Sequence, residues 1–130
     1  MSLLSFTDPQ ALITKFDELK ASPDFFICYF TGGVDEASGK SWCPDCDVAR
    51  PGVQKTVIDQ TKLQVLKGVV DDRNTWVGVA DHPYKAHPVF RAGGVPCLLL
   101  LKGEQVLVRI EDEKDFQNPE LLEQLVNPQD

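Results

Sequence analysis

Two uninterrupted apolar runs constrain the fold of this chain more than any other feature. The first covers residues 25–31, is rich in aromatic side chains and closes at Gly32-Gly33. The second covers residues 97–101, is rich in leucine and lies within a predicted strand from Pro96 to Lys102. Both are far shorter than the roughly 20 apolar residues that cross a bilayer. Runs of this length without polar alternation are typical of strands buried on both faces, so the sheet that they form needs covering layers on both sides.

Helical patterns lie around and between these runs. Asp8-Pro9 predicts a capped helix start near the N-terminus, and Asn118-Pro119 predicts another near the C-terminus. A longer helix should begin at Cys43-Pro44 and extend to about Gln60. Pro51 removes one of its internal hydrogen bonds and should kink it.

The remaining segments complete a mixed sheet. Gln64 to Val70 is a further strand candidate, and Gly103-Glu104 predicts a tight turn into a strand from Gln105 to Ile110. Prolines and glycines between Asp71 and Gly94 predict a long loop that holds one or two short helices. Residues 1–130 are therefore expected to form a single α/β domain with helices on both faces of a mixed central sheet.

The chain is acidic. It has 130 residues, of which 20 are Asp or Glu and 13 are Lys or Arg, for a net charge of −7. Such a surface repels phosphate backbones and anionic lipids, which argues against nucleic acid and membrane partners. The first six residues lack the basic region and the long apolar stretch of a secretory signal, so we expect a cytosolic protein.

The four cysteines are Cys28, Cys43, Cys46 and Cys97. In a reducing compartment, the C-x-x-C spacing of Cys43 and Cys46 favours a redox or metal-binding role over a structural bridge. Cys28 and Cys97 lie in apolar runs, where a free thiol behaves as a small hydrophobic residue. Two alternatives stay open: a zinc site formed by all four thiolates, and a structural Cys43–Cys46 disulfide without turnover.

The residues suited to chemistry concentrate in the segment Trp42-Cys43-Pro44-Asp45-Cys46. Two cysteines three residues apart at a helix start lie about one turn apart, within the roughly 4.4–6.8 Å between the Cα atoms of a disulfide. Free backbone N–H groups and the positive end of the helix dipole stabilise a thiolate at Cys43. Cys43 should therefore attack a substrate disulfide, and Cys46 should resolve the mixed disulfide.

Two carboxylates, Asp45 and Asp47, accompany this dithiol. Nearby negative charge opposes formation of a thiolate. A dithiol whose thiolate is less stabilised is more reducing, because strongly stabilised thiolates belong to oxidants. We therefore hypothesise a reductant and not a disulfide-forming oxidase.

Several motifs occur in a set order along the chain: Tyr29-Phe30-Thr31-Gly32, Gly39 to Cys46, Pro51 and Val95-Pro96. In that order they resemble thioredoxin-fold proteins, and most closely the family of thioredoxin domain-containing protein 17, with its Trp-Cys-Pro-Asp-Cys active site. The resemblance covers essentially the whole chain. It implies the thioredoxin fold, with Cys43 as the nucleophile and Cys46 as the resolving cysteine.

The resemblance also implies a substrate-binding surface around the dithiol. Pro96 matches the cis-proline that faces the two cysteines, and Val95 matches the residue whose backbone binds an extended substrate segment. We expect further substrate contacts from Trp42, Pro44 and Asp45, although a plain packing role for Trp42 stays open.

As function, the resemblance implies a cytosolic disulfide reductase that is recharged by NADPH through thioredoxin reductase. The flavin and the nicotinamide would belong to that reductase, and this chain would bind neither cofactor nor metal. Implied partners are cystine or selected protein disulfides and dynein light chain, and we expect a monomer. The alternative is a redox-sensing interaction module whose disulfide state controls docking to a partner.

The chain departs from thioredoxins in the strand before the motif. Thioredoxins place a buried aspartate there as a proton acceptor, whereas Ile27-Cys28-Tyr29 offers no carboxylate. We expect Cys28 to be a core thiol, and for Cys97, which directly follows Pro96, packing and a secondary redox role both stay open. Trp76 is expected to pack within its loop, and the histidines at 82 and 87 are expected to be exposed.

Overall fold

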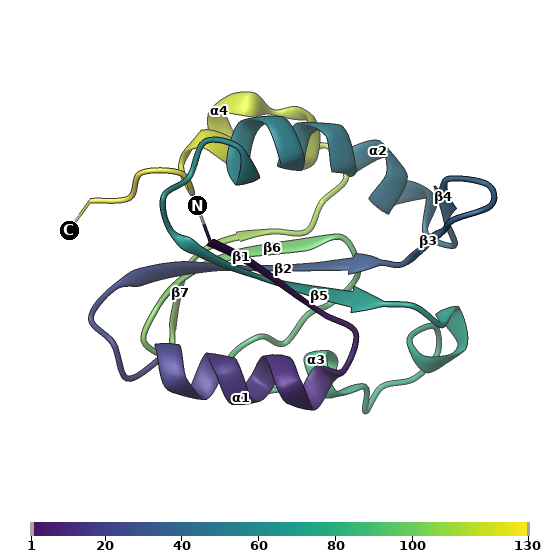
Figure 1. The fold of residues 1–130 in the computed structure, drawn as a ribbon, viewed down its shortest axis with the longest axis horizontal. Coiled ribbons are helices and arrows are strands. Elements are labelled where there is room, and N and C mark those ends of the chain that lie inside the picture. The colour runs from purple at the N-terminus through teal and green to yellow at the C-terminus, as the bar shows by residue number, and fades with distance from the viewer. Residues whose placement is uncertain (1, 130) are drawn as a thin grey trace.

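A five-stranded mixed sheet forms the centre of the molecule. The computed structural model describes residues 2–129. The strand order is β1-β5-β2-β6-β7 (Figure 1). Strands β1, β5 and β2 run parallel to one another, β6 is antiparallel to β2, and β7 is antiparallel to β6. This arrangement confirms the predicted α/β class with a mixed sheet. The strands are β1 (Ser2–Phe6), β2 (Phe25–Gly32), β5 (Gln64–Val70), β6 (Cys97–Lys102) and β7 (Gln105–Ile110).

Helices cover both faces of the sheet. In Figure 1, α1 (Pro9–Leu19) and α3 (Pro83–Ala86) lie on one face, and α2 (Pro44–Gly52) and α4 (Pro119–Glu123) lie on the other. The predicted helix starts are confirmed: Asp8 caps α1 by accepting from the backbone N–H of Gln10 at 3.1 Å, and Asn118 caps α4.

The predicted two-faced burial of the strand at residues 25–31 is confirmed by β2. Phe26, Cys28 and Phe30 pack into the core beneath α1, whereas Ile27 and Tyr29 pack against the helices on the α2 face. Because side chains alternate along a strand, one apolar run supplies both cores. Burial on both faces holds β2 in the centre of the sheet, and the chain leaves the end of β2 toward the Cys43 segment.

The helix predicted from Cys43-Pro44 to about Gln60 is present, with a change of hydrogen bonding after Pro51. Proline has no N–H to donate, and the helix continues from Val53 to Ile58 as a wider π-helical turn, with Asp59 N–H donating to the carbonyl of Gln54 at 2.9 Å. A π-helical turn is one of the recognised causes of a bend in a helix.

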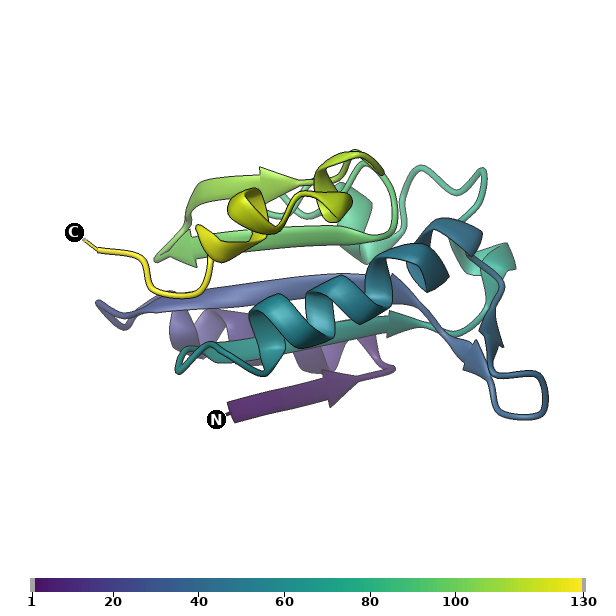
Figure 2. The same cartoon turned by 90° about the horizontal axis from the view of Figure 1, so that it is seen from above.

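Two features were not predicted. The edge strand β1 pairs with β5 although its side chains at Leu3 and Leu4 are exposed. The connection between β2 and α2 contains a two-stranded hairpin, β3 (Val34–Asp35) and β4 (Lys40–Ser41), which projects beyond the end of the main sheet (Figure 2).

The segment from Asp71 to Gly94 holds a single 3-10 turn, Arg73–Thr75, and the short helix α3, as predicted. The expectation that His82 is exposed is wrong: its side chain is buried, and its Nδ1 accepts from the backbone N–H of Tyr84 at 3.1 Å. His87 is half-buried and stacks on Phe90 with ring centroids 4.0 Å apart. Within residues 2–129, no helix is both long enough and apolar enough to cross a membrane.

Candidate active site

The Cys43–Cys46 pair lies at the N-terminus of α2. Cys43 is the N-cap residue and Pro44 the first helical residue, as the motif predicts. The two cysteines form a disulfide with their Cα atoms 5.2 Å apart. Cys43 keeps 6% of its surface exposed, whereas Cys46 is fully buried. The pair is therefore asymmetric: only the first cysteine is reachable from solvent.

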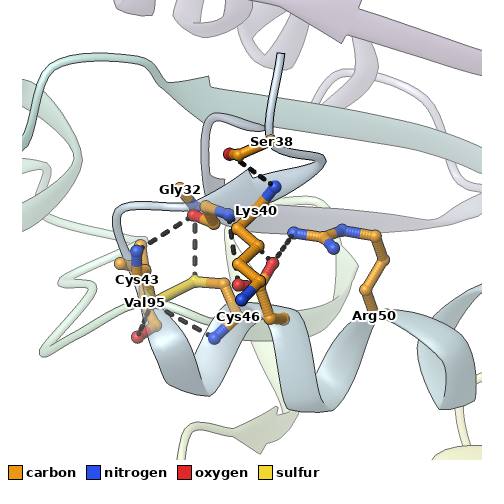
Figure 3. A network of polar contacts seen from close by, with 9 residues as sticks. Gly32, Ser38, Lys40, Cys43, Cys46, Arg50 and Val95 are labelled. Carbon is orange, nitrogen blue, oxygen red and sulfur yellow. Dashed lines mark hydrogen bonds and ion pairs between the residues drawn. A yellow bond between two sulfur atoms is a disulfide. The ribbon is translucent and has the colours of Figure 1, made fainter. Parts of the chain in front are cut away.

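Glycine at position 32 allows the motif to sit this close to the end of β2. A Cβ atom at Gly32 would lie 2.9 Å from the Cβ of Cys43 and 2.8 Å from the Oγ of Ser41. The Gly32 N–H points to the Sγ of Cys46 at 3.3 Å, and the Cys46 N–H points to the Sγ of Cys43 at 3.2 Å (Figure 3). These N–H groups stabilise negative charge on either sulfur after reduction.

The peptide bond between Val95 and Pro96 is cis, as the family resemblance implies. The carbonyl oxygen of Val95 lies 3.5 Å from the Sγ of Cys43, and Figure 3 shows Val95 beside the disulfide. Pro96 itself is buried behind Val95. The segment before β6 therefore faces the more exposed cysteine.

A cleft of about 400 Å³ opens in front of Cys43. It brings together four of the predicted substrate-binding residues and four that the sequence did not predict. The predicted ones are Trp42, Pro44, Asp45 and Val95, and the others are Arg73, Trp76, Val77 and Gly94. A cleft of this size suits a small molecule or an extended side chain.

Comparison with known proteins agrees with this geometry. The family model for the thioredoxin domain of thioredoxin domain-containing protein 17-like proteins matches residues 5–128. This chain belongs to that family.

The relatives and the structural neighbours point the same way. The chain is 35% identical over 101 residues to thioredoxin-like protein Clot of Arabidopsis thaliana, covering 77% of this chain and 74% of that protein. It is 36% identical over 86 residues to thioredoxin domain-containing protein 17 of Epinephelus coioides, covering 65% and 67%. Thioredoxin O2 of Arabidopsis thaliana in its oxidised state superposes with a TM-score of 0.60 at 18% identity, covering 97% and 96%, which shows a shared fold.

In this thioredoxin domain-containing protein 17-like chain, the two carboxylates of the motif differ sharply. Asp47 accepts from the Ser41 N–H at 3.0 and 3.1 Å and pairs with the Nη2 of Arg50 at 2.7 Å. The Arg50 guanidinium, followed by the Ser41 N–H, lowers the pKa of Asp47. Asp45 is exposed and makes no ion pair or hydrogen bond through its side chain within residues 2–129. The predicted opposition to thiolate formation therefore rests on Asp45, because the charge of Asp47 is compensated.

Both tryptophans have fixed places at the cleft. Trp42 donates its Nε1–H to the carbonyl of Val70 at 2.7 Å, which ties the motif to the end of β5. Trp76 is buried, with the Nζ of Lys85 4.5 Å from its ring centroid and the ring of His82 4.9 Å away. The expectation that Trp76 packs within its loop was incomplete, because it also lines the cleft.

The other two cysteines lie in the core of this family member. Cys28 and Cys97 are reduced, fully buried and part of the apolar cluster beneath α1. Burial raises the pKa of both thiols. The zinc alternative gains no support, since no group of three or more metal-ligating side chains suited to an ion occurs in the described part of the chain.

Strand β2 carries no carboxylate on the side that faces α2, where thioredoxins place a buried aspartate. Cys28 faces α1, and it is Tyr29 that faces the α2 side. The hydroxyls of Tyr29 and Thr31 are buried without a hydrogen-bond partner in the described residues, and burial raises the pKa of Tyr29. The α2-facing side of β2 therefore carries neutral hydroxyls in place of a carboxylate.

Proposed function

We infer that this chain carries out thiol–disulfide oxidoreductase chemistry, which its thioredoxin-family domain and its Cys43–Cys46 pair support. We propose more specifically that this chain is a cytosolic disulfide reductase for small-molecule or selected protein disulfides. The observation that carries the proposal is the asymmetric dithiol: Cys43 reaches the cleft at a helix N-terminus, and Cys46 is buried behind it.

The exchange balances in two steps. The Cys43 thiolate attacks one sulfur of the substrate disulfide; the substrate S–S bond breaks, a protein–substrate disulfide forms, and the first substrate thiolate leaves and takes a proton from water. Cys46 then gives up its thiol proton, and its thiolate attacks the Sγ of Cys43; the protein–substrate S–S bond breaks, and the second substrate sulfur leaves as a thiolate that takes up a proton. Two electrons pass from the dithiol to the substrate, and the Cys43–Cys46 disulfide is the oxidised product.

A new cycle needs a reductant for this disulfide. We propose thioredoxin reductase with NADPH, whose flavin and nicotinamide stay on that enzyme, and this chain would act as a monomer without a cofactor of its own. The resemblance to the family supports this proposal. The surface charge of −7 disfavours nucleic acid and anionic membranes as partners.

The first test is NADPH consumption in the presence of thioredoxin reductase and cystine. We expect turnover by the wild-type protein and a loss of about a thousandfold or more in Cys43→Ser, because a serine hydroxyl is not ionised at neutral pH. Turnover retained in Cys43→Ser would show that the nucleophile is another residue.

The second test distinguishes catalysis from simple docking. Cys46→Ser keeps the attacking thiol and loses the resolving one, so a mixed disulfide with substrate should accumulate in cell extract. A non-reducing gel with mass identification measures it, and Cys43→Ser/Cys46→Ser is the matched control. Partners that bind Cys46→Ser only non-covalently would favour the interaction-module alternative.

A further inference from the structure

The cleft in front of Cys43 holds two opposite charges from two different segments. Asp45 comes from the first turn of α2, and Arg73 comes from the 3-10 turn that follows β5. The other lining residues are uncharged, apart from Cys43 when its thiol is reduced and ionised. Both charged side chains are exposed, and neither makes an ion pair or side-chain hydrogen bond within residues 2–129. Their charges are therefore free for a ligand.

The backbone around Arg73 is held firmly, although its side chain is free. The Asp72 carboxylate accepts from the Asn74 N–H at 2.9 Å, and the Thr75 hydroxyl donates to the Asp72 carbonyl at 2.7 Å. The carbonyl of Arg73 accepts from the N–H of Val77 at 2.9 Å. Together with the packing of Trp76 against Lys85 and His82, these bonds keep the guanidinium-bearing turn at the rim of the cleft.

We propose that Arg73 and Asp45 select the substrate of the dithiol by charge. Arg73 binds a carboxylate, since a guanidinium offers a planar, charge-assisted pair of donors to that group. Asp45 binds an ammonium group. The cleft then prefers disulfides that carry both groups near the sulfur over disulfides that carry only carboxylates or only ammonium groups. This inference rests on the proposed reductase function and names what its cleft recognises.

The net negative charge of the chain makes Arg73 more important for binding a carboxylate. A net charge of −7 repels a carboxylate along most approaches, and Arg73 supplies a local attraction at the one place where the substrate sulfur meets Cys43. By contrast, Arg50 in the last turn of α2 is already paired with Asp47 and is not available to a substrate.

The test uses three disulfides of different charge: cystine, which carries both groups, 3,3′-dithiodipropionate, which carries only carboxylates, and cystamine, which carries only ammonium groups. Reduced protein is mixed with each disulfide, and acid quenching with mass analysis gives the second-order rate constant of Cys43–Cys46 oxidation. We expect Arg73→Ala to lower the rate about three- to tenfold for cystine and dithiodipropionate and to leave cystamine unchanged or faster. Arg73→Lys should restore at least half of the loss.

The other half of the proposal is tested with Asp45→Asn. Since this change also alters the reactivity of Cys43 toward every disulfide, the informative quantity is the ratio of the cystamine rate to the dithiodipropionate rate. We expect this ratio to fall about three- to tenfold. An unchanged ratio would show that Asp45 does not bind the ammonium group.

Lys62→Ala is the matched control, since Lys62 is exposed and precedes β5, whereas Arg73 follows it. It makes the same change of net charge at the opposite end of the strand and should leave the three rates in their wild-type proportions. The same pattern in Lys62→Ala as in Arg73→Ala, or an equal loss for all three disulfides in Arg73→Ala, would overturn the inference. Failure of the wild-type protein to react with any of the three would instead overturn the proposed function.

Discussion

The molecule contains two pairs of cysteines in opposite environments. Cys43 and Cys46 cap a helix at the end of the sheet, with N–H groups directed at both sulfurs and a cleft in front of the first. Cys28 and Cys97 lie on neighbouring strands beneath α1, surrounded by Phe, Leu and Tyr side chains. The same side chain is thus placed for reaction in one pair and for packing in the other.

This contrast shows that backbone polarity and access decide which thiol reacts. A thiol becomes a nucleophile when its thiolate is stabilised and reachable. The helix N-terminus supplies stabilisation at Cys43, whereas burial raises the pKa of Cys28 and Cys97. The comparison predicts effects of very different size in the two pairs.

The largest expected effect is in alkylation. In the reduced, folded protein, iodoacetamide should modify Cys43 at least about a thousandfold faster than Cys28 or Cys97, because modification of a buried thiol must wait for local unfolding. Peptide mass analysis after timed quenching measures the three rates.

Denaturant provides the control for this experiment. In 6 M guanidinium chloride the rates of Cys43, Cys28 and Cys97 should come within about tenfold of one another, because the environments that separate them are gone. Rapid modification of Cys97 in the folded protein would contradict its assignment to the core.

Local patterns in the sequence predicted most of the fold. The apolar runs gave β2 and β6, and Asp8, Asn118 and the prolines after them gave the helix starts. Strand β1 escaped prediction because its residues have no distinctive pattern: Leu3 and Leu4 are exposed, and the strand is held by backbone pairing with the distant β5. Pairing between segments about sixty residues apart leaves no local signal.

The residues of the site likewise fall into those that a local motif predicted and those that only the fold brings to the cleft. The segment from Trp42 to Cys46 and the Val95-Pro96 step could be recognised because their chemistry is local to a motif. Arg73 and Trp76 line the cleft because the chain after β5 returns toward Cys43. No residue spacing in the sequence predicts that path. Asp47 follows Cys46 directly in the sequence, which predicted that its charge acts on the dithiol. In the structure its carboxylate instead pairs with the Ser41 N–H and the Arg50 guanidinium.

The second prediction tests the packing role of the core pair. Cys28→Ser should lower the free energy of unfolding by about 1–3 kcal/mol, because a hydroxyl is buried in an apolar cluster without a partner. Cys28→Ala removes the sulfur without adding a polar group and should be less destabilising. Urea unfolding measures both, and disulfide reductase activity should stay within about twofold of wild type. Cys97→Ala should likewise keep its activity, and a marked loss there would favour a redox role for Cys97.

The third prediction compares the two carboxylates of the active helix. Asp45→Asn should raise the alkylation rate of Cys43 at pH 6 by about two- to threefold, because an uncompensated negative charge near the thiolate is removed. Asp47→Asn should change the rate less, since Arg50 already balances that charge. Iodoacetamide is neutral, so attraction of the reagent into the cleft does not contribute. A larger effect of Asp47→Asn would show that Arg50 does not shield it.

The smallest expected effect is in the acid stability that Asp47 provides. The pKa of Asp47 is lowered from its ordinary value of 3.8, so its stabilising contribution is present above that pH and is lost as the pH falls through the lowered folded-state pKa. Asp47→Asn should therefore reduce the urea midpoint slightly between about pH 5 and 7, and the difference from wild type should disappear near about pH 2. Asp45→Asn, the same chemical change two residues earlier, is the matched control and should lower the urea midpoint less at pH 7, because Asp45 makes no ion pair or side-chain hydrogen bond within residues 2–129. A difference for Asp47→Asn that persists at pH 2 would mean that the side chain stabilises the loop by packing and not through its charge.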